Sequence, residues 1–123
     1  MIVAGIGFSS GFWPIDVVEL VRRAQSEAGC IAEALAVPDF KNGEAGLHEA
    51  AKCLGLPVIF VDRAALEEAQ QRCETRSAIA EVALGLASVA EACALVVAGP
   101  ESRLLVARIS LGKVTCAIAG GQL

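Results

Sequence analysis

Apolar and polar positions along the chain form blocks that predict short strands separated by helices. The first block, Met1–Gly7, is uncharged and contains several β-branched residues, as expected of a strand buried on both faces of a parallel sheet. The second, Pro14–Ala28, repeats apolar residues with the period of an amphipathic helix and ends at Gly29. We therefore predict that the first strand lies in the middle of a sheet and that the first helix covers one face of it.

The same alternation continues to the end of the chain. The expected elements are strand Ile31–Val37, helix Glu44–Leu54, strand Pro57–Val61, helix Arg63–Cys73, a helix from Ser77 to Gly85, a helix from Ser88 to Gly99, and strands Leu104–Ile109 and Val114–Ala119. Gly112 lies where a tight turn needs positive φ, so the last two strands should form an antiparallel hairpin. The pattern predicts a single three-layer α/β domain over residues 1–123, with a mixed sheet of about five strands, three parallel plus the hairpin, and helices on both faces.

Composition and charge exclude several classes of protein. Hydrophobic residues make up 55% of the 123 residues and charged residues 20%, which argues against disorder. The net charge is −4 and basic residues are scattered, so a nucleic-acid surface is not expected. The apolar region Val82–Gly99 has Glu91 in its middle, and Ser88 and Glu91 have capping-box spacing, which favours two short helices over a membrane span.

The five cysteines, at positions 30, 53, 73, 93 and 116, form no C-x-x-C pair and match no zinc or iron–sulfur spacing. We expect free thiols, mostly buried, and no bound metal. No signal-peptide pattern precedes the first strand, so we expect a cytoplasmic protein.

A glycine-rich bend follows the first strand and is the first candidate site. Gly5, Gly7 and Gly11 allow close approach of the backbone, and the hydroxyls of Ser9 and Ser10 face the same opening as the N–H groups of the next helix. A ligand with negative oxygens would fit there, although a glycine turn that merely joins strand to helix would show the same residues. The three aromatic residues of the bend either stack on a flat ligand or fix the start of the helix: Phe8, Phe12 and Trp13.

The glycine spacing argues against a dinucleotide cofactor. Gly5-x-Gly7-x-x-x-Gly11 differs from G-x-G-x-x-G, and the helix begins seven residues after Gly7. We expect no cofactor of this kind.

A polar loop after the second predicted strand is the second candidate site. Asp39, Lys41 and Glu44 would lie at the same edge of the sheet as the glycine bend, where open parallel sheets bind ligands. A lysine beside two carboxylates could form an acid–base group, but a solvated loop would have the same composition. His48, the only histidine, is expected on the surface or at a helix end.

Three blocks of sequence resemble a known family. They are Gly5-Ile6-Gly7 with the turn to Gly11, Asp39-x-Lys41-x-x-Glu44-x-Gly46-Leu47, and Ser88-Val89-Ala90-Glu91-Ala92 through to Val114-Thr115-Cys116-Ala117-Ile118-Ala119. On these blocks, which span nearly the whole chain, the sequence resembles the cobalamin-biosynthesis family of CobE and the carboxy-terminal domain of CbiG, the cobalt-precorrin hydrolase. That family usually shows a Cys-Arg pair after the second glycine, where this chain has Phe8-Ser9.

The resemblance implies a role in cobalamin (vitamin B12) biosynthesis with a corrin-ring or precorrin intermediate as ligand. Because the amino-terminal domain of CbiG is absent here, the resemblance implies binding or transfer of the intermediate, in the form associated with the aerobic pathway. The alternative is the CbiG-type hydrolase reaction, which opens a lactone ring with loss of a two-carbon fragment. Expected partners are the corrinoid and other cobalamin-biosynthesis enzymes.

Overall fold

The computed structural model describes residues 1–41, 43–75 and 88–121. In chain order its elements are β1 (Ile2–Phe8), α1 (Pro14–Ala28), β2 (Ala34–Pro38), the 3-10 turn η1 (Asp39–Lys41), α2 (Ala45–Leu54), β3 (Val58–Val61), α3 (Arg63–Glu68), the 3-10 helix η2 (Ala69–Arg72), α5 (Val89–Ala98), β4 (Arg103–Leu111) and β5 (Val114–Gly120). The helix predicted from Ser77 to Gly85 lies outside the described residues.

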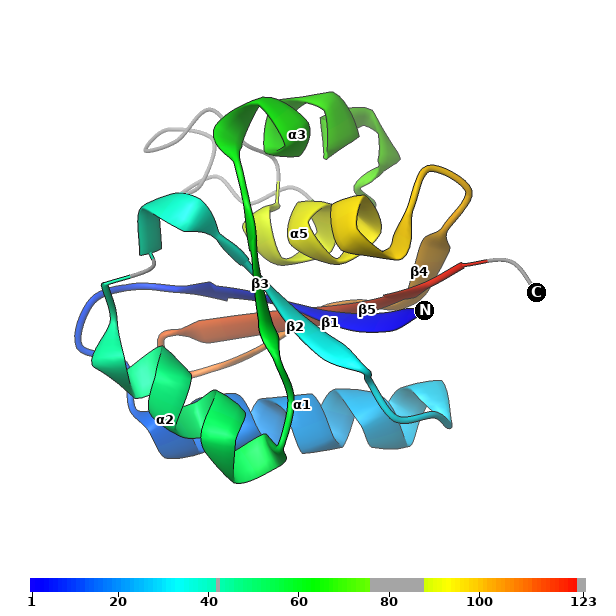
Figure 1. Cartoon of the computed structure of the whole chain (residues 1–123). Coiled ribbons are helices and arrows are strands. Elements are labelled where there is room, and N and C mark those ends of the chain that lie inside the picture. The colour runs from blue at the N-terminus through cyan, green and yellow to red at the C-terminus, as the bar shows by residue number, and fades with distance from the viewer. Residues whose placement is uncertain (42, 76–87, 122–123) are drawn as a thin grey trace.

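The strands form one mixed sheet with the order β3-β2-β1-β5-β4 (Figure 1). β1, β2 and β3 are parallel, whereas β5 is antiparallel to both β1 and β4. β1 is therefore the central strand, and the last two strands form the hairpin, with Gly112 at φ 59° in its turn. The predicted fold class, three parallel strands plus an antiparallel carboxy-terminal hairpin, is confirmed.

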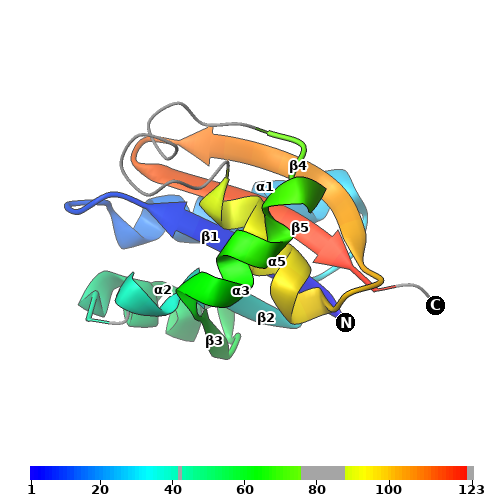
Figure 2. The ribbon, with the colours of Figure 1, turned by 90° about the horizontal axis from the view of Figure 1, so that it is seen from above.

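Helices cover both faces of the sheet. α1 and α2 lie on one face, whereas α5 lies directly on the other and α3 packs against α5 (Figures 1 and 2). On the α1 face, Val17, Leu20 and Val21 pack with apolar residues of the sheet, which confirms the predicted inward stripe of that helix. The second face is packed with smaller side chains, among them Ala36 and Ala92.

The small side chains on the second face allow α5 to lie very close to β1. A Cβ atom added to Gly5 would clash with the Ala90 carbonyl oxygen and would lie 2.7 Å from the Ala94 nitrogen. Gly7 is buried, and a Cβ atom there would lie 2.6 Å from Thr115 Oγ1. Glycine at both positions is thus explained by packing within the molecule.

Some element boundaries differ from the sequence-based expectations. The helix predicted over Arg63–Cys73 is α-helical only to Glu68 and tightens into the 3-10 helix η2, a frequent ending of short helices. Asp62 caps α3 as predicted, because its side chain accepts a hydrogen bond from the Ala65 N–H at 2.8 Å. None of the helices in the described part of the chain is both long enough and apolar enough to cross a bilayer.

No disulfide joins the five cysteines, but they are less buried than expected. Cys93 and Cys116 are buried, Cys30 and Cys73 are partly buried, and Cys53 is exposed. The expectation of mostly buried thiols was therefore wrong for Cys53, because residues 50, 51 and 54 take the inner face of α2 and leave position 53 on its outer face. Burial raises the pKa of the Cys116 thiol to about 12.

Candidate ligand-binding site

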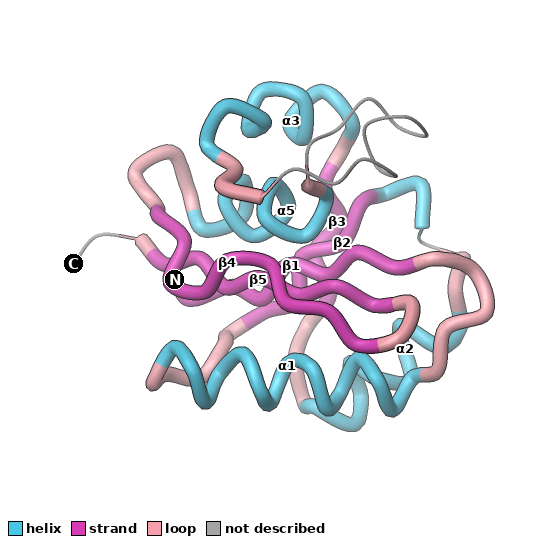
Figure 3. The backbone as a smooth tube through the Cα atoms, turned by 180° about the vertical axis from the view of Figure 1, so that it is seen from behind, coloured by secondary structure: helices cyan, strands magenta, loops and turns pink. Residues whose placement is uncertain are grey.

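The segments that follow β1 and β2 lie at one edge of the sheet, because the two strands are parallel neighbours. The turn between β4 and β5 joins them there, because Phe8 at the end of β1 pairs with Val114 at the start of β5. We call this edge the carboxyl edge; it is formed by residues 8–13, 39–41, 43–44 and 112–113. It is the end of the molecule at which the loops after β1 and β2 appear together in Figure 3.

Contacts of Gly46, near the start of α2, bring the two predicted loops together. A Cβ atom at Gly46 would lie 3.2 Å from Phe12 Cζ and 3.2 Å from Pro14 Cγ, so the bend after β1 packs against the first turn of α2. The prediction that the two loops lie on a common edge is confirmed. A side chain at position 46 would have to displace this contact.

The aromatic residues of the bend divide into two groups. The rings of Phe8 and Phe12 lie with their centroids 4.5 Å apart and pack against the core below α1. Trp13 is 72% exposed at the N-cap of α1, and Ile15 next to it is 63% exposed. Phe8 and Phe12 thus fix the entrance to the helix, whereas Trp13 presents its ring to solvent.

The residues predicted to bind a ligand lie at different depths. Gly5 and Gly7 are buried below α5 and Thr115, so any contact they make with a ligand would have to be indirect. Ser9, Ser10 and Gly11 are exposed on the carboxyl edge, and Gly11 has a φ of 81°, which favours glycine.

The polar loop after β2 forms the neighbouring part of the edge. Asp39 is exposed at the start of η1 and Lys41 ends this turn. Glu44 is partly buried and is the N-cap residue of α2. Phe40, between the first two, is 44% exposed. The acid–base role of Asp39, Lys41 and Glu44 stays a prediction.

The helices that start at this edge differ in how their first turns are capped. The side chains of Asp62 and Ser88 accept hydrogen bonds in the first turns of α3 and α5, respectively. The N-cap residues of α1 and α2, Trp13 and Glu44, make no such side-chain hydrogen bond. The N–H groups of Asp16 and Leu47 donate instead to the backbone carbonyl oxygens of Trp13 and Glu44, at 2.9 and 3.1 Å. The first turns of α1 and α2 thus lack a side-chain cap, at the positive ends of two helix dipoles.

Glu91 has a structural role that the sequence analysis missed. The predicted cap by Ser88 is present, since its Oγ accepts from the Glu91 N–H at 3.4 Å. The carboxylate, however, is fully buried and accepts backbone hydrogen bonds from Glu74 and Thr75 at 2.8 Å each and from Arg108 at 2.9 Å. The Arg108 contact falls where the β4–β5 register is shifted between Val106 and Ile109. An acid inside an apolar run was the only signal in the sequence.

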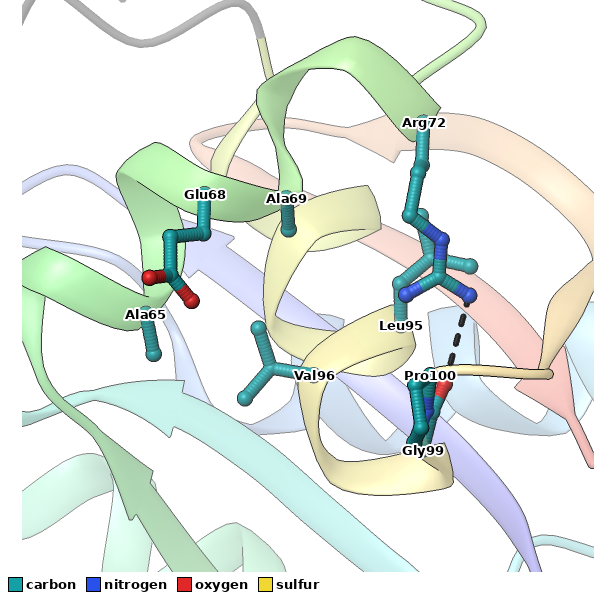
Figure 4. A pocket seen from close by; sticks show the side chains of 8 residues that line it. All are labelled: Ala65, Glu68, Ala69, Arg72, Leu95, Val96, Gly99 and Pro100. Carbon is teal, nitrogen blue, oxygen red and sulfur yellow. Dashed lines mark hydrogen bonds between the residues drawn. The ribbon is translucent and has the colours of Figure 1, made fainter.

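A separate cavity of about 310 Å³ lies at the C-terminal end of α5, away from the carboxyl edge (Figure 4). Its lining includes Ala65 and Glu68 of α3, Arg72 of η2 and Val96 of α5. Arg72 Nη2 donates to the carbonyl oxygens of Gly99 and Ser102 at 3.2 and 2.5 Å, so this guanidinium fixes the turn after α5. None of the predicted site residues lines this cavity.

Comparison with known proteins places the chain in a family. A family model described as "Cobalamin synthesis G C-terminus" matches residues 2–119. The chain belongs to this family. The family resemblance seen in the three sequence blocks is thereby confirmed.

Individual relatives of the chain carry the names of cobalamin-biosynthesis proteins. Protein CobE of a Sinorhizobium species is 34% identical over 122 residues, which cover 97% of this chain and 79% of that protein. The crystal structure of CobE, "a protein from the cobalamin (vitamin B12) biosynthetic pathway", has a TM-score of 0.88 at 35% identity and covers 97% of this chain and 89% of its own. The cobalamin biosynthesis protein chiG of Agrobacterium tumefaciens has a TM-score of 0.79 at 33% identity over the whole of both chains. This chain is thus a cobalamin-biosynthesis protein of the CobE/CbiG type.

Proposed function

We propose that this protein binds or transfers a corrin-ring intermediate of cobalamin biosynthesis at the carboxyl edge. The observation that carries the proposal is the meeting, at one edge, of two helix starts without side-chain caps and an exposed serine and glycine bend. Membership of a cobalamin-biosynthesis family supports a corrin-ring intermediate as the class of ligand.

The chemistry of a corrinoid suits the two kinds of surface at this edge. A corrinoid is a broad plate with an apolar face and a rim of carboxylates. Backbone N–H groups at helix starts and the hydroxyls of Ser9 and Ser10 can donate hydrogen bonds to carboxylates. The exposed rings of Trp13 and Phe40 offer apolar contact for the plate. Together these groups would hold the rim and one face of the same ligand.

The proposed contacts follow the sequence-based prediction with one refinement. Six residues of the edge would make the direct contacts: Ser9, Ser10, Gly11, Asp39, Lys41 and Glu44. The buried residues Gly5 and Gly7 would act by letting α5 and β5 pack closely below the bend, and Phe8 by supporting Phe12.

The single tryptophan provides a direct binding assay. Trp13 is the only tryptophan in the chain and lies on the carboxyl edge, so a corrinoid that binds there should quench its fluorescence. We expect saturable quenching by a corrinoid acid at micromolar concentrations, and co-elution of the coloured ligand with the protein on gel filtration. Absence of both at these concentrations would reject the proposal.

A second candidate activity is opening of a precorrin lactone with loss of a two-carbon fragment. It is favoured by the position of Asp39, Lys41 and Glu44, which follow β2 directly on the carboxyl edge. In that case the protein would release acetaldehyde from a lactone intermediate, and Lys41→Ala and Asp39→Asn would abolish the release. Equal release by both variants and the unchanged protein would exclude the acid–base assignment.

Transfer of an intermediate requires partners that supply and accept it. We infer that these are other cobalamin-biosynthesis enzymes and that they meet this protein in the cytoplasm, where the exposed thiol of Cys53 would stay reduced. A pull-down with the purified protein that recovers no enzyme of the pathway would count against transfer and leave binding alone.

A further inference from the structure

A lysine from the opposite end of the chain lies over the glycine-rich bend. Lys113 belongs to the turn between β4 and β5, and its carbonyl oxygen accepts a hydrogen bond from the Ser9 N–H at 3.0 Å. Its ammonium donates to the Ser10 carbonyl oxygen at 3.4 Å, and a Cβ atom at Gly11 would lie 3.3 Å from this ammonium. The turn and the bend lie at the same end of the sheet in Figures 1 and 3. The hydrogen bond from the Ser9 N–H thus fixes the backbone of Lys113 in a position from which its side chain extends over the bend.

The surroundings of Lys113 leave its charge available to a ligand. The residue is exposed, and within residues 1–41, 43–75 and 88–121 no carboxylate lies in ion-pair distance of its ammonium. Asp16 of α1 lies against this turn, and its carboxylate oxygen Oδ2 would be 3.0 Å from a Cβ atom at Gly112. An ammonium has three donors, and the contact with Ser10 uses one of them.

No residue of the bend has a charged side chain that could pair with an anion. Residues 8–13 are Phe-Ser-Ser-Gly-Phe-Trp, so a cation at this part of the edge has to come from another element. Lys113 provides one directly above the exposed serines, next to the start of α1.

We propose that Lys113 binds a carboxylate of the ring substituents and so makes the site prefer a carboxylate-bearing corrinoid over one whose substituents are amides. This inference rests on the proposed function, because it assigns a contact within the same site. The ammonium and the N–H groups of the bend would act on the same part of the ligand rim. Glycine at position 11 leaves space for the lysine to lie across the bend.

The test compares two ligands and three variants at one low ionic strength, because salt screens exposed charges. The variants are Lys113→Ala, Lys113→Arg and, as a matched control, Lys52→Ala, which removes an exposed lysine from the last turn of α2. The ligands are a corrinoid with free carboxylates and the same ring with its substituents amidated. Circular dichroism and thermal unfolding check that each variant is folded.

We expect Lys113→Ala to weaken binding of the acid about three- to tenfold and to leave binding of the amide unchanged. Lys113→Arg and Lys52→Ala should bind both ligands as the unchanged protein does. Equal binding of the acid by Lys113→Ala and the unchanged protein would overturn the role of Lys113 while leaving the proposed function intact. If the unchanged protein binds neither ligand, the proposed function fails and the role of Lys113 fails with it.

Discussion

At position 5 the absence of a side chain lets a helix lie directly on the central strand. The space above Gly5 is taken by backbone atoms of α5, namely the Ala90 carbonyl oxygen and the Ala94 nitrogen. Backbone atoms in the middle of a helix cannot move aside without breaking its hydrogen bonds, so even a methyl group at position 5 would displace α5 from the sheet.

We therefore predict that Gly5→Ala destabilises the protein by about 3 kcal/mol or more. The measurement is the free energy of unfolding in urea, or the yield of folded protein if the variant does not fold. Gly43→Ala is the matched control, because no atom in the described part of the chain lies within 4 Å of a Cβ atom there. A Gly5→Ala variant as stable as Gly43→Ala would contradict the packing of α5 on β1.

Single residues also show the limit of what the sequence could predict. A glycine in a strand signals that something approaches closely, but that partner can be a ligand or another part of the same chain. For Gly5 and Gly7 the structure supplies a partner from residues about 85 to 110 positions away, Ala90 and Thr115 respectively. No local pattern contains that information.

At the scale of elements, the start of α1 carries an unusual cap. Trp13 has extended backbone angles, φ −93° and ψ 128°, which suit an N-cap residue, but its side chain cannot accept a hydrogen bond from the first turn. Because the ring is 72% exposed, its removal should cost little packing. A hydroxyl at this position would stabilise the helix.

We predict that Trp13→Ser raises the free energy of unfolding by about 0.5 to 1 kcal/mol relative to Trp13→Ala. Both variants should bind the corrinoid acid more weakly than the unchanged protein, since both lose the ring. Stability is followed by circular dichroism and binding by the absorbance of the ligand, because neither variant has a tryptophan. Equal stability of the two variants would show that the first turn of α1 gains nothing from a cap.

Helices and strands were predictable where apolar residues recur with the period of the element. The inward stripe of α1 and the hairpin turn at Gly112 follow directly from the sequence. The partners of Glu91 do not, because its spacing from Ser88 is that of a capping box while its carboxylate binds N–H groups 16 and 17 residues away. A local rule identifies the cap but not the long-range contact.

At the scale of the molecule, the burial of two thiols makes the free energy of unfolding depend on pH. Burial raises the pKa of Cys116 to about 12 from an ordinary 9.0, and burial, with a smaller effect of Cys73, also raises the pKa of Cys93. The unfolded chain therefore loses these protons at a lower pH than the folded chain. Their contribution to stability is fully present below pH 9.0 and decreases as the pH rises towards the folded pKa values.

We predict that the free energy of unfolding falls above pH 9.0 by up to about 1.4 kcal/mol per pH unit for each buried thiol. The measurement is urea unfolding between about pH 8 and pH 11, the range in which an ordinary thiol ionises. Cys116→Ala should flatten this dependence, whereas Cys53→Ala, at an exposed position, should not. An unchanged slope in Cys116→Ala would contradict the burial of that thiol.

The central position of β1 could be predicted because few topologies agree with the pattern. Strand and helix alternation requires parallel neighbours, and a tight turn requires an antiparallel pair, which places the uncharged first strand at the centre. The carboxyl edge followed from the same reasoning. The reach of Lys113 across the bend did not, since it depends on the pairing of β1 with β5, over 100 residues apart in the chain.

The contact between Glu91 and Arg108 has a consequence for the behaviour of many copies in solution. Outer strands of a sheet attract strands of other molecules through their unused backbone groups. Here one outer strand, β3, is only four residues long, and the other, β4, is irregular where its Arg108 N–H is bound by the carboxylate of Glu91. Neither border offers a long regular template, which disfavours pairing of the sheet edge with a strand of another molecule.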